Sequence, residues 1–204
     1  MAYRRTPQIQ ARLDGQRAAI TQAATELVGE SGYSGCSIVR VAARAGVASG
    51  TVYNHFAGKD DLLAEVFRAV VSREVEAVRA AAAPPGSAAD RLTAVIETFA
   101  GRAMKSPRLA YALLAEPVAP QVDVLRLTFR QAFTDVVAAA VADGIASAEL
   151  PPQNPGVAAS ALIGAIGEVL VDPLDRGVAE PDTVPTLITF ALCGIGVATR
   201  NGSS

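Results

Sequence analysis

The sequence predicts an all-α protein made of a small N-terminal three-helix head and a larger helical body. Apolar residues recur at three- and four-residue spacing along most of the chain, Pro or Gly separates these segments, and no strand alternation is convincing. The 204 residues are enough for a head and a second domain with its own core. We expect the head to cover residues 1–58 and the body residues 59–204.

The first predicted helix of the head covers residues 16–30. Its apolar residues form one helical stripe, and Gly32 follows where a C-cap belongs. The stripe consists of Ile20, Ala23, Ala24, Leu27 and Val28. The polar segment before it, residues 1–12, is expected to be a disordered or DNA-contacting arm that carries Arg4 and Arg5.

Two short helices with a tight turn between them are predicted next. Ser37 can cap a helix over residues 37–45, and Gly46 supplies the positive φ that the turn needs. The second helix opens near Ser49 and turns Val52 and Phe56 inward. Its outward residues are small or polar, which suits a helix whose N-terminus enters the major groove of DNA.

The segment from Val41 to Leu62 resembles the tetracycline-repressor (TetR) family of bacterial transcription regulators. The matching residues are Val41, Ala42, Ala45, Gly46, Val47, Gly50, Thr51, Val52, Tyr53, His55, Phe56, Lys59, Asp60, Asp61 and Leu62. Two positions depart from the family pattern: Ala48 replaces the usual capping Ser, and Arg40 stands where an acid often completes a capping box. The resemblance implies a helix-turn-helix DNA-binding head on a ligand-binding and dimerisation body.

The resemblance also implies roles for the residues of the head. Phosphate contacts are expected from Thr51, Tyr53, His55 and Lys59. Base edges are expected to be approached by Arg40, Arg44, Ser49 and Asn54, with Gly50 allowing a close backbone contact.

The charge distribution supports this orientation, although the net charge is −2. Through Lys59 there are seven basic and three acidic residues, whereas the remainder holds eleven basic and seventeen acidic residues. A basic head on an acidic body directs the head toward phosphates.

The body is predicted to contain helices over residues 58–82, 88–105, 107–115, 122–145, 155–171 and 183–199. The resemblance implies that a small-molecule inducer enters between the first of these and the helices near 90–145. Candidate contacts are the large side chains Phe67, Phe99, Met104, Tyr111, Leu114, Phe129 and Phe133, so we expect a largely apolar ligand. No cofactor or metal is expected, because Cys36 and Cys193 do not have metal-ligand spacing.

The last two predicted helices are apolar nearly all round, so protein or lipid must cover them. Their uncharged runs are shorter than the roughly 20 residues that a membrane span needs. We therefore expect a homodimer without a membrane, with Leu162, Ile166, Leu187 and Phe190 at the interface.

An enzyme is not favoured, because the one histidine, His55, lies inside the helix-turn-helix and no catalytic residues are identified. No signal peptide is recognised in the first residues, so a cytoplasmic location is expected. The leading hypothesis is a ligand-responsive homodimeric repressor that binds double-stranded palindromic operator DNA. The alternative is a helical small-molecule-binding protein whose DNA head is vestigial.

Overall fold

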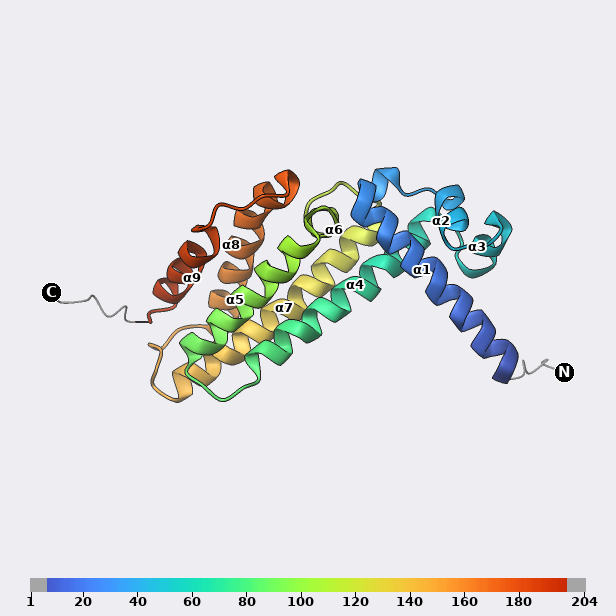
Figure 1. Cartoon of the computed structure of the whole chain (residues 1–204). Helices are drawn as coiled ribbons and strands as arrows, with labels where there is room; N and C mark the ends of the chain where they lie inside the picture. The colour runs from blue at the N-terminus through green and yellow to red at the C-terminus, as the bar shows by residue number, and fades with distance from the viewer. Residues whose placement is uncertain (1–6, 198–204) are drawn as a thin grey trace.

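The computed structural model describes residues 7–197, which contain nine helices and no strand. The all-α prediction is confirmed. The helices are α1 (Pro7–Gly35), α2 (Ile38–Arg44), α3 (Ser49–His55), α4 (Lys59–Ala82), α5 (Ala88–Lys105), α6 (Pro107–Leu114), α7 (Pro120–Ala146), α8 (Pro155–Arg176) and α9 (Thr183–Gly194). We call α1–α3 the head and α4–α9 the body; they lie at opposite ends of an elongated molecule (Figure 1).

Helix α1 is longer than the sequence predicted at both ends. It begins at Pro7, so part of the expected arm is helical, while Arg4 and Arg5 lie outside the described residues. It also continues beyond the expected stop to Gly35 across a kink at Gly32, whose φ is 69°. Only glycine adopts this left-handed conformation without steric cost, so the helix changes direction there.

The helix-turn-helix forms as its sequence predicts. The Ser37 Oγ accepts a hydrogen bond from the Arg40 N–H at 3.3 Å and caps α2. Gly46 has a φ of 67° in the turn, and α3 begins at Ser49. Val52 and Phe56 are buried, which fixes the inner face of α3 against α1 and α2.

The apolar core of the head continues into the body along α4. Phe56 belongs to the same buried cluster as Leu62 and Phe67 of α4, Leu113 of α6 and Val122 just inside α7. A boundary at residues 58 and 59 therefore separates α3 from α4 but does not separate two cores. The head and the near end of the body pack as one unit.

In the body, α4 runs beside α5 and α7, and α8 and α9 lie on the far side of the bundle (Figure 1). The prediction that α8 ends near residue 171 is wrong: α8 includes Pro173 and ends at Arg176, and Gly177, whose φ is 70°, caps it. A proline removes only the hydrogen bond to one preceding carbonyl, and the left-handed glycine ends the helix. Helix α9 ends at Gly194, earlier than the expected residue 199, and residues 198–199 lie outside the described range.

Within residues 7–197, α8 alone is long and apolar enough to cross a membrane by length and composition. One such helix is weak evidence, because core helices of soluble proteins meet the same criterion. Leu162, Ile166, Leu170 and Leu174 recur at four-residue spacing and are buried against the rest of the chain. Helix α8 thus has one face in the protein core.

Candidate functional site

The outer face of α3 is the first candidate site. Tyr53 is 59 % exposed, and Asn54 and Gly50 beside it are also exposed, whereas Val52 is 0 % exposed. The predicted residues Ser49, Thr51 and His55 are half-buried. The helix therefore presents one short polar face to solvent while its opposite face holds the head together.

Arg17 fixes the end of α3. Its guanidinium donates to the His55 carbonyl at 2.7 Å and to the Glu65 carboxylate of α4 at 3.1 Å, and it lies 4.3 Å from the centre of the Phe56 ring. In the sequence, Arg17 is one of the seven basic residues of the head and carries no other signal. Its tie between α1, α3 and α4 could not be read from spacing, because the partners are 38 and 48 residues away.

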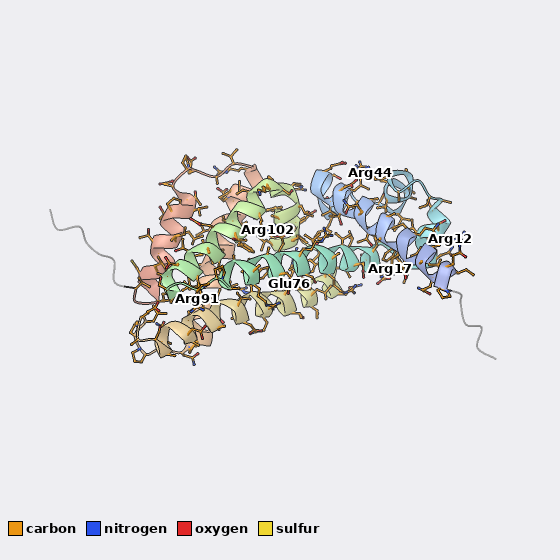
Figure 2. All side chains as sticks on the ribbon, turned by 60° about the horizontal axis from the view of Figure 1, so that its bottom comes forward. Arg12, Arg17, Arg44, Glu76, Arg91 and Arg102 are labelled. Carbon is orange, nitrogen blue, oxygen red and sulfur yellow. The ribbon has the colours of Figure 1, made fainter. Side chains whose placement is uncertain are left out.

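Arg44 and Arg40, predicted to approach base edges, are both engaged inside the head. Arg44 donates to both carboxylate oxygens of Glu30, at 2.8 and 2.9 Å. This hydrogen bonding raises the pKa of Arg44 and lowers the pKa of Glu30 from their ordinary values. Arg40 donates to the Ser31 hydroxyl at 3.1 Å and to the Gly35 carbonyl. Both side chains brace α2 against α1, and Figure 2 shows Arg12, Arg17 and Arg44 on the head.

Lys59 is the first residue of α4 and is half-buried beside the end of α3. The His55 Nε2 lies 3.4 Å from the Gln16 Oε1 of α1. Asp61 accepts a hydrogen bond from the Ala57 N–H at 3.0 Å, which stabilises the turn between α3 and α4. Two of the predicted phosphate contacts, His55 and Lys59, therefore flank one turn, which the hydrogen bond between Ala57 and Asp61 holds in place.

The second candidate site is a cavity of about 490 Å³ in the body. Its size lies within the usual range for small-molecule pockets. Its walls come from five helices, α4 to α8, and aromatic pairs line it: Phe67 with Phe129 at 5.7 Å between ring centres, and Phe99 with Phe133 at 5.3 Å. The cavity is mostly apolar and suits a ligand with an extended apolar part.

Charged side chains also line the cavity, and they differ in their partners. Glu74 accepts two hydrogen bonds from Arg102, and Arg126 pairs with Asp123 at 3.0 Å. Arg130 and Glu168 form no ion pair within the described part of the chain. One nitrogen of Arg130, on α7, is 3.2 Å from the place where a Cβ on Gly164 would stand. This glycine of α8 therefore leaves room for the Arg130 guanidinium.

Five of the seven predicted ligand residues line this cavity: Phe67, Phe99, Leu114, Phe129 and Phe133. Met104 and Tyr111 do not. Met104 is five residues beyond Phe99, which turns it about 140° around α5. Tyr111 lies under the Arg108 guanidinium, 5.7 Å from ring centre to the charge.

The wall that α8 provides and the arginines of α7 were not among the predicted ligand contacts. Ile163, Gly167 and Val171 line the cavity from α8. Arg126 and Arg130 are four residues apart, and each stands three residues before Phe129 or Phe133. That interleaving of arginine and aromatic residues on one helix was the available signal.

Three of the four residues predicted at a dimer interface are buried inside the single chain. Leu162, Ile166 and Leu187 are at most 5 % exposed, and Ile166 lines the cavity. They cannot be assigned to an interface, because their side chains already pack in the chain's own core. Phe190 is 59 % exposed and stays available on α9.

Comparison with known proteins agrees with the geometry of the head. Residues 20–66 match the model of "Bacterial regulatory proteins, tetR family". Residues 20–66 of the chain are thus similar to the DNA-binding segment of the TetR family. The chain is 32 % identical over 77 residues to the "Fatty acid metabolism regulator protein" of Bacillus subtilis (strain 168), covering 38 % of this chain and 40 % of that protein. It is 35 % identical over 83 residues to the "HTH-type transcriptional regulator BetI" of Escherichia coli (strain K12 / DH10B), covering 40 % and 43 %.

These alignments span about two fifths of the length of the curated relatives. Solved structures extend the likeness of fold over most of the chain. FadR from Bacillus halodurans superposes with a TM-score of 0.77 at 18 % identity, covering 96 % of this chain and all of that one. FadR from Bacillus subtilis in complex with stearoyl-CoA gives 0.75 at 20 % identity, covering 89 % and 99 %. At these identities the likeness establishes the fold alone.

Proposed function

We propose that this chain is a ligand-responsive transcriptional regulator of the TetR type, acting as a homodimeric repressor that a small molecule releases from a palindromic operator. The observation that carries the proposal is the combination of a TetR-family head with a body that encloses an apolar cavity of about 490 Å³. The curated relatives are regulators rather than enzymes. A polar α3 face and an apolar cavity in one chain suit a protein that couples two binding events.

We assign DNA contacts to the exposed face of α3 and to its flanks. Asn54 is the base-reading candidate, since it is exposed on α3 and carries both a donor and an acceptor. Thr51, Tyr53, His55 and Lys59 are assigned to phosphates, with Ser49 and Gly50 at the close approach. The partners of Arg40 and Arg44 inside the head favour a bracing role for them over base reading.

The ligand we propose is an amphipathic anion with a long apolar chain, of which a fatty acyl-CoA is the example to test. The aromatic walls suit the apolar chain, and the Arg130 guanidinium, which has no ion pair within the described residues, suits a carboxylate or a phosphate of the anionic head. The FadR structure solved with stearoyl-CoA, which has the same fold, supports this choice of probe.

The dimer we propose forms through the outer faces of α8 and α9. Val157 and Val169 of α8 and Phe190 of α9 are exposed apolar side chains on these helices. Phe190→Asp is expected to yield a folded monomer, whereas the control Leu187→Asp places a charge in the core and is expected to unfold the chain. Sedimentation velocity and circular dichroism measure the two effects. A wild-type monomer at micromolar concentration would refute the dimer.

The central experiment selects bound sequences from a randomised DNA library and then titrates the complex with stearoyl-CoA. The expected result is a palindromic consensus with half-sites one helical turn apart, and release of the DNA on titration. Failure to enrich any sequence would refute the DNA-binding role. Enrichment without release by stearoyl-CoA would leave a regulator but overturn the acyl-CoA ligand.

Arg130→Ala tests the assignment of the anionic head. Loss of a charge-assisted hydrogen bond is expected to weaken stearoyl-CoA binding by about tenfold. The matched control is Glu168→Gln, which changes another cavity residue without an ion pair in the described part of the chain. Its affinity is expected to stay at the wild-type value or to rise, since a negative charge is removed. Isothermal titration calorimetry of both variants checks the assignment.

A further inference from the structure

The segment between the end of α6 and the first turns of α7, residues 112–126, belongs to both the cavity and the head. We call it the α6–α7 corner. Leu113, Leu114 and Arg126 in this corner line the cavity. Glu116, two residues beyond Leu114, is only 8 % exposed and faces the end of α1. The same short segment therefore touches both candidate sites.

The Glu116 carboxylate holds the backbone of α1 directly before the helix-turn-helix. One oxygen accepts from the Tyr33 N–H at 3.0 Å, and the other accepts from the Ser34 N–H at 3.2 Å. A Cβ on Gly32 would stand 2.5 Å from the first oxygen, so glycine is needed there for space as well as for its φ. Ser37, the N-cap of α2, follows Ser34 by three residues.

Arg126 ties the corner together from the cavity side. Its guanidinium donates to the carbonyls of Leu113 at 2.9 Å, Ala112 at 2.8 Å and Glu116 at 2.5 Å. The Ala112 and Leu113 carbonyls lie in the last turn of α6, where no helical N–H can reach them, and the Glu116 carbonyl follows two residues after the helix ends. A displacement of Arg126 or Leu113 by a cavity occupant must therefore move the backbone that carries Glu116.

We infer that the α6–α7 corner is a second connection between the cavity and the head, and that Glu116 is the positioning residue through which cavity occupancy alters the head. The inference rests on the proposed function, in which the cavity takes a ligand that controls DNA binding. Helix α4 is the covalent link between the two sites, and the Glu116 contact is a second one.

The Glu116 contact suits a two-state element because its buried carboxylate is costly to separate from the buried Tyr33 amide and the part-buried Ser34 amide. Without the carboxylate, the Tyr33 and Ser34 amides must find water or another acceptor, so partial states are unfavourable. A cavity occupant that binds better when the Glu116 contact is broken raises the fraction of molecules in that state. Fewer heads then keep the orientation that binds DNA. The coupling then needs no contact between ligand and DNA.

Glu116→Gln is the first test, with Glu168→Gln as the matched control on the cavity wall. Glutamine keeps the size of the side chain but presents one acceptor and one donor, so at least one of the two amide bonds is lost. Amide hydrogen exchange at Tyr33 and Ser34 is expected to rise about tenfold in Glu116→Gln and to stay unchanged in Glu168→Gln. Glu116→Asp, which shortens the side chain, is the second variant if the first does not fold.

The decisive test fills the cavity without a ligand. Gly167 lines the cavity and has open space at its Cβ position, so Gly167→Met places a side chain inside it. We expect faster exchange at Tyr33 and Ser34 in this variant, and no further increase when it is combined with Glu116→Gln. Val171→Phe fills the same cavity from the next turn of α8 if Gly167→Met does not fold.

Protected amides at Tyr33 and Ser34 in a folded, cavity-filled protein would overturn the inference, because Glu116 would then have a purely structural role. The DNA selected in the central experiment separates this failure from that of the proposed function. If Gly167→Met binds DNA more weakly but the Tyr33 and Ser34 amides stay protected, the role of the α6–α7 corner is refuted and the proposed function stands. Amides that respond in a protein that enriches no DNA sequence refute the proposed function alone.

Discussion

The head and the body use their polar side chains differently. In the head, Arg17, Arg40 and Arg44 are held by carboxylates, hydroxyls and carbonyls of neighbouring helices. In the body, a cavity of about 490 Å³ is lined by Arg130 and Glu168, which form no ion pair within residues 7–197. The family match also stops at residue 66, just inside α4. The arginines of the head tie its own helices together, whereas Arg130 and Glu168 of the body have no such partner in the described part of the chain, as the proposed ligand site requires.

A buried charge in each region gives the largest contrast. Val52→Asp puts a carboxylate in the solid core of the head and is expected to lower the free energy of unfolding by about 3–5 kcal/mol. Val171→Asp puts the same group on the cavity wall, where water can reach it, and is expected to cost clearly less. Urea denaturation of both variants measures the difference. Equal losses of unfolding free energy in the two variants would mean that water does not reach the cavity wall, and would contradict the difference between head and body.

The junction between the regions is tested by two glycines of α1. Gly32→Ala is expected to lower the free energy of unfolding by about 2 kcal/mol, because alanine is strained at a φ of 69° and its Cβ meets the Glu116 carboxylate. Gly29→Ala is the control: its Cβ meets only the Leu109 Cβ at 3.8 Å, so a gain of up to about 1 kcal/mol in helix propensity is expected. A neutral Gly32→Ala in thermal denaturation would contradict the described contact.

Two substitutions on the outer face of the head distinguish residues that read bases from residues that bind phosphates. Asn54→Ala is expected to relax preference at particular base pairs, with a loss of about 1–3 kcal/mol for each good contact. Lys59→Ala is expected to weaken binding to all sequences alike and to reduce the log–log salt slope by nearly one. Fluorescence anisotropy with matched and mismatched DNA at several salt concentrations distinguishes them. Unchanged sequence preference in Asn54→Ala would show that it is not a reader.

The smallest effect concerns the exposed pair of Glu30 and Arg44. The hydrogen bond from Arg44 lowers the pKa of Glu30 below its ordinary 4.5, so the folded state binds this proton less readily than the unfolded chain. The stabilisation is therefore present above pH 4.5 and is lost as the pH falls through the folded pKa. Glu30→Gln is expected to flatten the acid side of a urea-midpoint profile slightly. The difference is expected to shrink in 1 M salt, since the pair is exposed; a salt-independent difference would contradict this cause.

The sequence by itself determined the local features of this protein. The Ser37 cap, the Gly46 turn and the inward faces of Val52 and Phe56 follow from contacts within a few residues, so spacing and residue type were enough. The aromatic residues of the cavity were also found, since large apolar side chains on amphipathic helices must meet somewhere. Local pattern was insufficient for Met104 and Tyr111, whose faces depend on how α5 and α6 are rotated.

Only the tertiary structure decided which groups from distant parts of the chain meet. Glu116 binds amides 82 and 83 residues away, and Arg17 holds a carbonyl 38 residues away. Leu162, Ile166 and Leu187 were predicted to face a partner, yet they are buried in the chain's own core. An apolar helix shows in its sequence that it must be covered, but its packing partner depends on the positions of all the other helices.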